Sequence, residues 1–231
     1  MIEIKGLSKT YKGVEVLNIP DMKVQKGEAF GLVGNNGAGK TTFFRMILDL
    51  IRPTAGEVLS KNIAVSHSED WKFYTGSFLD ESFLIDYLTP DEYFNFLATL
   101  HKFSQGDLEE FLNQFHDLFN GEILGKTKYI RDLSKGNQKK VGVVAALMGN
   151  PEILILDEPF ANLDPTTQIR LKTLLRELKV KHQMTMLISS HDINHVTEVC
   201  ERIVILEKGI IQKDIQTSES TLKDLEEYFT V

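Results

Sequence analysis

Short apolar runs recur along the chain, each bounded by polar or turn-forming residues. The three clearest are Ala29–Val33, Ile153–Leu156 and Met184–Ser189. Runs of this kind, without polar alternation, are typical of strands buried on both faces, as in parallel sheets. The first run leads into Thr41–Ile51, where apolar side chains recur at helical spacing. Such strand, loop and helix units predict the α/β class, with a mostly parallel sheet and flanking helices.

Two later segments also predict helices. One follows Asp164-Pro165, an N-cap and first-position pair, and extends to about Lys181. The side chains expected to face the core are Ile169, Leu174, Leu175 and Leu178. The other helix is expected from Asp192 to Glu201.

The remaining strand patterns are shorter and alternate weakly. They are Ile2–Leu7, Val14–Val24 with a break at Pro20, Gly56–Leu59, Ile63–Val65, Ile203–Glu207 and Ile210–Lys213. Proline cannot donate to a strand ladder, which explains the break. The strands near Gly56 and Ile63 predict a small antiparallel layer beside the parallel sheet.

Helical patterns interrupt the α/β order in the middle of the chain. Phe73–Tyr87 is aromatic-rich but follows neither the helix nor the strand period, so an irregular segment is expected there. A helix is predicted from Thr89 to Leu100, with Tyr93, Phe94, Phe96, Leu97 and Leu100 inward. A second has one apolar face from Leu108 to Phe119, and a third runs from Ser134 to near Gly149.

These patterns predict one domain over residues 1–231. Residues 1–76 and 151–215 are expected to form a core, 77–150 an inserted α-helical subdomain and 216–231 a C-terminal helix, with Thr217–Tyr228 as its helical pattern.

The composition narrows the function classes. A net charge of −7 argues against a broad basic surface, so no nucleic acid partner is expected. No apolar run approaches the roughly 20 residues of a membrane span, and Met1–Lys5 begins a strand pattern and not a signal peptide. A cytoplasmic chain is therefore expected. The single cysteine, Cys200, is expected to be buried.

A phosphate-binding loop follows the strand Ala29–Val33 and opens the next helix. Its residues are Gly34, Asn35, Asn36, Gly37, Ala38, Gly39, Lys40, Thr41 and Thr42. They fit G-x-x-x-x-G-K-[ST], in which backbone N–H groups and the helix N-terminus attract a polyphosphate. Lys40 is expected to reach the β- and γ-phosphates, and the Thr41 hydroxyl to ligate Mg²⁺.

Acidic and histidine side chains end two of the apolar runs. Asp157 and Glu158 follow Ile153–Leu156, at the sheet edge where α/β proteins bind ligands. Adjacent residues of an extended chain point in opposite directions, so Asp157 is expected to face Mg²⁺ and Glu158 a water. His191 lies at the end of Met184–Ser189, where a structural role is the alternative to phosphate contact.

Two further features allow both a structural and a functional interpretation. The third middle helix opens with Leu133, Ser134, Lys135, Gly136, Asn137 and Gln138. Ser134 is either a plain N-cap or, with the Gly136 amide, part of a second anion site. Tyr11, at a strand end, either packs or offers a flat face to adenine.

Taken in order, these motifs resemble the ATPase subunit of an ATP-binding cassette (ABC) transporter along nearly the whole chain. The ordered set comprises the phosphate loop, the helical insertion, Leu133–Gln138, Asp157-Glu158, Asn162-Leu163-Asp164 and His191. The family signature usually reads Leu-Ser-Gly-Gly-Gln. Here Lys135 replaces the first glycine and Asn137 the glutamine, a variant associated with exporter-type (ABC-2 type) cassettes.

The resemblance implies a P-loop NTPase core with ATP and Mg²⁺ as cofactors. Tyr11 would stack on adenine, and the residues from Gly34 to Thr42 would hold the triphosphate, with Lys40 among the catalytic residues. Asp157 would orient the Mg²⁺ shell, Glu158 would act as general base and His191 would contact the γ-phosphate.

The resemblance also implies a site shared between subunits. The signature Leu133–Gln138 would serve the ATP of a second nucleotide-binding subunit, a copy of this chain or a paralogue, and Asn162-Leu163-Asp164 would serve communication between subunits. Head-to-tail dimerisation would then drive a transmembrane permease subunit, which would hold this chain at the inner face of the cell membrane.

One position departs from the family pattern. The glutamine usual in the loop before the helical subdomain is matched here by Asp80, a possible Mg²⁺ ligand, or by Glu81. The aromatic segment Phe73–Tyr87, with Tyr93 and Phe94, is expected either to form a docking groove for the permease or to pack in the core.

Two other functions compete with a transport ATPase. A soluble ABC ATPase acting on nucleic acid or translation usually carries two cassettes or long coiled-coil arms, and the sequence has neither, nor a basic stripe. A regulatory nucleotide-binding module without turnover is disfavoured by Glu158, because degenerate sites tend to lose this carboxylate.

Overall fold

The computed structural model describes residues 1–218, 221–222 and 225. In these residues, eleven strands form one sheet. The strands are β1 (Ile2–Tyr11), β2 (Val14–Ile19), β3 (Met22–Val24), β4 (Ala29–Val33), β5 (Ala55–Ser60), β6 (Ile63–Ala64), β7 (Thr75–Phe78), β8 (Ile153–Leu156), β9 (Thr185–Ser190), β10 (Arg202–Glu207) and β11 (Ile210–Gln216). The helices are α1 (Lys40–Ile47), α2 (Pro90–Leu100), α3 (Gln105–Asn113), α4 (His116–Phe119), α5 (Lys135–Leu147), α6 (Pro165–His182) and α7 (Ile193–Val199).

The sheet has a parallel half and an antiparallel half. Strands β7, β8, β9, β4 and β10 are parallel neighbours, whereas β1 pairs antiparallel with β2, β3 and β5. The two halves are continuous, because β11 pairs with both β10 and β2. The α/β class with an antiparallel β portion is therefore confirmed, and the antiparallel strands continue the parallel ones in one mixed sheet.

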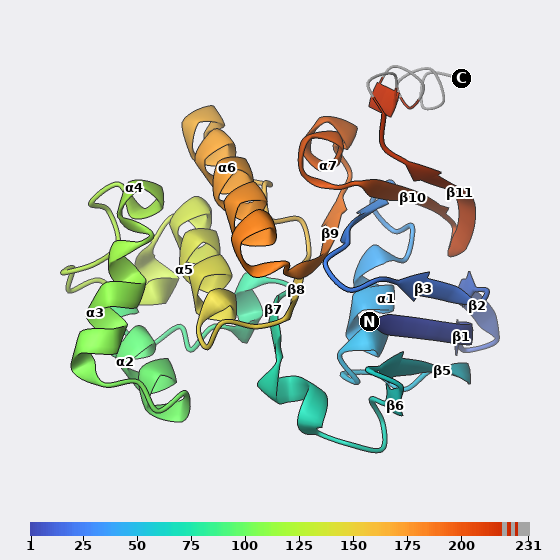
Figure 1. Cartoon of the computed structure of the whole chain (residues 1–231), viewed down its shortest axis with the longest axis horizontal. Helices are drawn as coiled ribbons and strands as arrows, with labels where there is room; N and C mark the ends of the chain where they lie inside the picture. The colour runs from blue at the N-terminus through green and yellow to red at the C-terminus, as the bar shows by residue number, and fades with distance from the viewer. Residues whose placement is uncertain (219–220, 223–224, 226–231) are drawn as a thin grey trace.

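Helices cover the parallel half on both faces. Ile153 and Ile155 of β8 pack in the cluster that holds α1, and Leu154 and Leu156 pack in the cluster that holds α5 and α6. This alternation follows the two-residue period of a strand. The strands β1, β2, β3 and β5 lie at one end of the molecule and α2, α3 and α4 at the other (Figure 1).

The middle of the chain differs from the sequence prediction in three ways. β7 lies in the segment expected to be irregular, and it spans the boundary predicted between residues 76 and 77. The apolar face from Leu108 to Phe119 is divided between α3 and α4, because the chain leaves helical geometry at Phe115. Phe96 and Leu100 of α2 are exposed, although they were expected inward.

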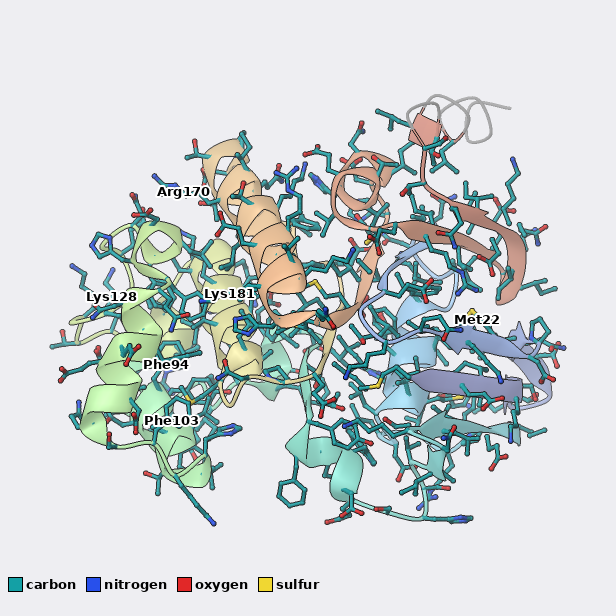
Figure 2. All side chains as sticks on the ribbon, in the orientation of Figure 1. Met22, Phe94, Phe103, Lys128, Arg170 and Lys181 are labelled. Atoms are coloured by element: carbon teal, nitrogen blue, oxygen red, sulfur yellow. The ribbon has the colours of Figure 1, made fainter. Side chains whose placement is uncertain are left out.

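Other packing predictions can also be judged. Ile169 of α6 is exposed, contrary to expectation, while Leu171 and Leu175 are buried. Cys200 is buried, as predicted, and burial raises the pKa of its thiol. Arg170 of α6 donates to the Asp117 carbonyl at 2.7 Å and so joins α6 to α4 (Figure 2).

The C-terminal end of the chain is described in part. β11 continues to Gln216, and the helix predicted for Thr217–Tyr228 lies largely outside the described residues. None of the helices within the described residues is long and apolar enough to cross a membrane.

Candidate functional site: a phosphate loop and a second helix N-terminus

The phosphate loop joins β4 to α1 at the carboxyl edge of the parallel strands. Gly39, the N-cap residue of α1, has a φ of 108° and offers no side-chain cap. A Cβ on Gly34 would lie 2.2 Å from the Leu206 carbonyl oxygen, so only glycine fits that approach. The uncapped N-terminus of α1 leaves backbone N–H groups for an anion.

Lys40 is buried inside this loop, with 6% of the residue exposed. Its Nζ donates to the Gly34 carbonyl at 2.6 Å and lies 3.1 Å from Glu158 Oε1. The lysine and the glutamate predicted to act on phosphate and water are therefore in direct contact. A buried ammonium paired with one carboxylate can exchange that partner for phosphate oxygens.

Asp157 lies buried beside Thr41. Its carboxylate accepts hydrogen bonds from the hydroxyls of Thr41 and of Ser189 on β9. Burial raises the pKa of the Asp157 carboxyl, and the two hydroxyls oppose this rise. Oxygen donors on a desolvated carboxylate suit a hard cation, so Thr41 and Asp157 fit the Mg²⁺ predicted from the sequence.

Glu158 and His191 approach each other at the same edge. His191 Nδ1 lies 2.8 Å from Glu158 Oε2, and the Glu158 N–H donates to Ser189 Oγ at 2.9 Å. Glu158 has a φ of 48°, a left-handed conformation uncommon for a residue with a side chain. The structure thus places Lys40, Glu158 and His191 together, and their catalytic roles stay predictions.

A pocket of 310 Å³ connects Tyr11 to this site. Its lining includes Tyr11, residues 36–42 and Glu158. The Tyr11 ring is half exposed, and Lys9 Nζ lies 4.9 Å from its centroid. An aromatic face beside the phosphate loop agrees with the adenine interpretation.

The signature segment lies elsewhere, at the N-terminus of α5. Ser134 is the N-cap, and its hydroxyl accepts from the Asn137 N–H at 3.2 Å. The Gln138 amide orders the preceding turn by donating to three backbone carbonyls, those of Ile130, Arg131 and Leu133. Ser134 and Asn137 line a separate pocket of 640 Å³. The structural role of Ser134 is present, and a role toward a second ATP stays a prediction.

The Asn162-Leu163-Asp164 turn contacts both α6 and the start of α5. Asp164 caps α6 by accepting from the Thr167 N–H at 3.0 Å, and this contact with Thr167 lowers the pKa of Asp164. A Cβ on Gly136 would lie 2.8 Å from the Asn162 carbonyl oxygen. The start of α5 therefore rests directly on this turn.

The two acids after β7 point to different partners. Asp80 Oδ2 lies 3.6 Å from Arg45 Nη2 on α1, and Asp80 also accepts from the Ser82 N–H. Glu81 lies near Lys139 and Lys135, at 3.8 and 4.0 Å. Asp80 thus contacts α1, and its role as a Mg²⁺ ligand stays a prediction.

Two residues of this region were missed by sequence reasoning. Ser189 bonds both Asp157 and Glu158, and its position as a polar residue near the end of a buried strand could have signalled it. Lys139, 5% exposed, donates to the Glu158 carbonyl at 2.7 Å. Nothing local indicates this contact, because a lysine on a helix is usually solvated.

Comparison with known proteins agrees with the motif order. The sequence profile of a family described as "ABC transporter" matches residues 17–161. The chain is 35% identical over 209 residues to the uncharacterized ABC transporter ATP-binding protein YhaQ of Bacillus subtilis, covering 90% of this chain and 69% of YhaQ. It is 32% identical over 230 residues to the bacitracin transport ATP-binding protein BcrA of Enterococcus faecalis, covering 95% and 70%.

One relative is named for import, and one solved structure has a similar fold. The methionine import ATP-binding protein MetN of Carboxydothermus hydrogenoformans is 30% identical over 227 residues, covering 94% of this chain and 67% of MetN. A dimeric ATP-binding cassette, MJ0796 bound to ADP and Pi, superposes with a TM-score of 0.83 at 26% identity, covering 94% of this chain and 99% of that one.

Proposed function

The chain belongs to the ABC transporter family as an ATP-binding subunit with ATPase activity, and we propose that it drives a membrane exporter by head-to-tail pairing around ATP. The observation that carries the pairing is the separation of Ser134 from the pocket that holds Lys40 and Glu158. A second nucleotide-binding subunit would bring its own signature to the open phosphate loop.

Each residue of the phosphate-loop site then has a defined task. Lys40 transfers its ion pair from Glu158 to the β- and γ-phosphates, and the Tyr11 ring stacks on adenine. Thr41 and Asp157 would hold Mg²⁺, which would supply positive charge to the phosphate oxygens. When Lys40 no longer contacts Glu158, the Glu158 carboxylate can accept a hydrogen bond from a water.

Hydrolysis is in-line transfer of the γ-phosphoryl group to that water. Glu158 takes the proton as the water oxygen bonds to phosphorus, and the bond to the ADP oxygen breaks. His191, whose Nδ1 contacts Glu158, contacts the γ-phosphate from the same edge. The Ser134 hydroxyl and Gly136 N–H of the second subunit add donors to the developing charge.

Replacement of the base tests this function. Glu158→Gln should bind ATP, form a stable dimer with it and turn over very slowly, because an amide cannot accept the proton. Glu152→Gln removes an exposed carboxylate that pairs with Lys61 and serves as the control. Gel filtration with ATP and a phosphate-release assay give both readouts, and turnover of Glu158→Gln at the wild-type rate would contradict the assignment.

The permease is proposed to dock beside the aromatic segment after α1. Phe73, Phe83 and Tyr87 are 87%, 51% and 64% exposed, and Phe83 lines a pocket of 590 Å³ together with Trp71. Exposed aromatic clusters mark partner surfaces.

The proposed docking groove contains fewer aromatic side chains than the sequence allowed. Tyr93 and Phe94 were expected either in this groove or in the core, and both are buried, with Phe94 among the helices of the subdomain (Figure 2). Phe83→Ala should weaken copurification of the permease and leave ATP binding intact, and Ile169→Ala, an exposed apolar residue on α6, should change neither. Loss of folding in Phe83→Ala would contradict the docking role.

The direction of transport has a second candidate. Lys135 in the signature favours export, whereas the similarity to the methionine import protein MetN favours import. We propose export and, through the permease, a peripheral position on the inner face of the cell membrane. Identification of the membrane protein that copurifies with this chain, followed by transport assays in vesicles, tests both points.

A further inference from the structure

Glu158 occupies a conformation that its surroundings must maintain. Its φ of 48° lies in the left-handed region, which is unfavourable for a residue with a Cβ. Two side chains fix its backbone from either side. Ser189 Oγ of β9 accepts from the N–H at 2.9 Å, and Lys139 Nζ of α5 donates to the carbonyl at 2.7 Å.

Lys139 is an unusual residue to find in this place. Its side chain is 7% exposed, and burial lowers the pKa of its ammonium. A buried charge is costly unless it is hydrogen-bonded and paired, and Lys139 has the Glu158 carbonyl and Glu81, 3.8 Å away, for these purposes. The Lys139 side chain thereby joins α5 to the loop after β7 and to Glu158, whose carboxylate is the proposed base.

We propose that Lys139 is a positioning residue for ATP hydrolysis, whose ammonium holds the Glu158 peptide so that the carboxylate is directed at the attacking water. This inference rests on the proposed role of Glu158 as the base. The carbonyl and the side chain share one Cα, so rotation of this peptide displaces the carboxylate. Misplacement of a catalytic group by about 1 Å can cost about 100-fold in rate.

The same contact makes Glu158 responsive to movement of α5. Lys139 directly follows the signature and lies about one helical turn after Gly136, which packs against the Asn162 carbonyl. The start of α5 therefore touches the 158–162 segment at two points. Rearrangement of α5 when subunits pair reaches the base through Lys139, and rearrangement of the loop at Glu81 reaches it through the ion pair.

Lys140 provides a matched control for Lys139. Both lysines are 5% exposed and lie on the first turns of α5. Lys140 Nζ instead pairs with Glu122 at 3.2 Å, away from Glu158. Replacement of Lys140 thus lowers stability as the loss of any buried lysine would, but it leaves the contact between Lys139 and the Glu158 carbonyl in place.

The test measures kcat and KM for Mg²⁺-ATP in the full chain, with the affinity of a fluorescent ATP analogue measured separately. Lys139→Met should lower kcat about 10- to 100-fold, since hydrogen bonds from charged donors are worth about 1.5–3 kcal/mol. KM and analogue affinity should stay within about twofold, because Lys139 does not touch the phosphate loop. Lys139→Arg, which keeps a cationic donor, should recover at least about a third of kcat.

The outcomes separate this inference from the proposed function. Wild-type kcat in Lys139→Met, equal losses in Lys139→Met and Lys140→Met, or loss of analogue binding together with kcat would each overturn it. If Lys139→Met does not fold, Glu81→Gln should lower kcat about threefold at unchanged KM, and an unchanged kcat overturns the inference. Slow Glu158→Gln beside a fast Lys139→Met overturns the Lys139 role alone, whereas a fast Glu158→Gln overturns the base assignment.

Discussion

The N-termini of α1 and α5 each border a pocket, but they differ in their N-cap and in the charge beside it. At α1 the N-cap is Gly39, no side chain caps the helix, and buried Lys40 adds positive charge. At α5 the Ser134 hydroxyl already accepts from a backbone N–H, and Lys135 is held near Glu81. The first terminus is open to a polyphosphate, whereas the second is a capped helix end, for which we propose a ligand supplied by another subunit.

This difference supports the proposal that the phosphate loop is half of a site. The loop has charge, backbone donors and a base in one pocket, and the donors of the signature lie in another. Substitutions at the α1 terminus should therefore abolish ATP binding, and those at the α5 terminus should spare binding and reduce turnover.

The largest effect is expected at Lys40. Lys40→Met removes a buried cation from the phosphates and leaves Glu158 without its partner, so kcat/KM should fall on the order of 1,000-fold. Calorimetry should show that ATP binding is lost. Lys172→Met removes a buried lysine of α6 that pairs with Glu198 on α7 and should leave binding intact, and equal losses in both variants would contradict the role of Lys40.

Ser134 should show the second largest effect. Ser134→Ala should leave ATP binding by the single chain unchanged and lower turnover about 100-fold, because the donor acts on the ATP of the other subunit. Ser104→Ala removes a comparable cap from α3 and isolates the structural part, worth about 1 kcal/mol. Equal turnover in the two variants would leave Ser134 as a cap alone.

Tyr11 should have a smaller effect. Tyr11→Leu removes a stacking surface and should weaken ATP binding about tenfold, since stacking of a base on an aromatic ring is worth about 1–3 kcal/mol. Tyr129→Leu removes another half-exposed ring that lies near a cation, Arg131, and provides the control. Unchanged ATP affinity in Tyr11→Leu would assign the adenine to another surface.

The smallest effect is a pH dependence of stability at His195. Its ring packs on Phe160 at 4.9 Å, and burial lowers the pKa of His195 below its ordinary value of 6.5. As the pH falls, the unfolded chain therefore binds the proton before the folded chain does. The contribution of His195 to stability is complete above about pH 7 and is lost as the pH falls through 6.5 toward the lower pKa of the folded state.

His195→Phe keeps the aromatic packing and removes the titration. Chemical denaturation between about pH 7.5 and 5.5 should show a shallower loss of stability in this variant. Asp192, Lys172, Glu198 and His191 also influence this ring, and they are unchanged in the comparison. Parallel curves for wild type and His195→Phe would contradict the assignment.

The sequence predicted the α1 terminus more completely than the α5 terminus. The phosphate loop, Asp157 and Glu158 are local patterns whose chemistry depends on neighbours in the chain. Lys139 could not be found in this way, because its partner lies 19 residues away across the fold. The strand β7 was missed because two small polar residues and Gly76 interrupt its apolar pattern, and this glycine is required where the Ala146 carbonyl oxygen lies 1.8 Å from the site of a Cβ.

Packing faces were predicted correctly where a helix lies flat on the sheet and wrongly where it borders solvent. Phe43 and Phe44 of α1 are buried, in agreement with the apolar spacing over Thr41–Ile51. Phe96 of α2 and Ile169 of α6 are exposed, because helical spacing alone does not fix the width of the buried stripe. Tertiary contacts decide how far that stripe extends.

A mixture of two inactive chains tests the half-site account most directly. Lys40→Met retains its signature and Ser134→Ala retains its phosphate loop, so a mixed dimer contains one intact site made from both. The account predicts that ATP hydrolysis by the mixture exceeds the sum of the two chains measured separately, up to about a quarter of the wild-type rate if subunits exchange freely and each site acts alone. Hydrolysis that equals the sum of the separate chains would contradict a site shared between two copies of this chain.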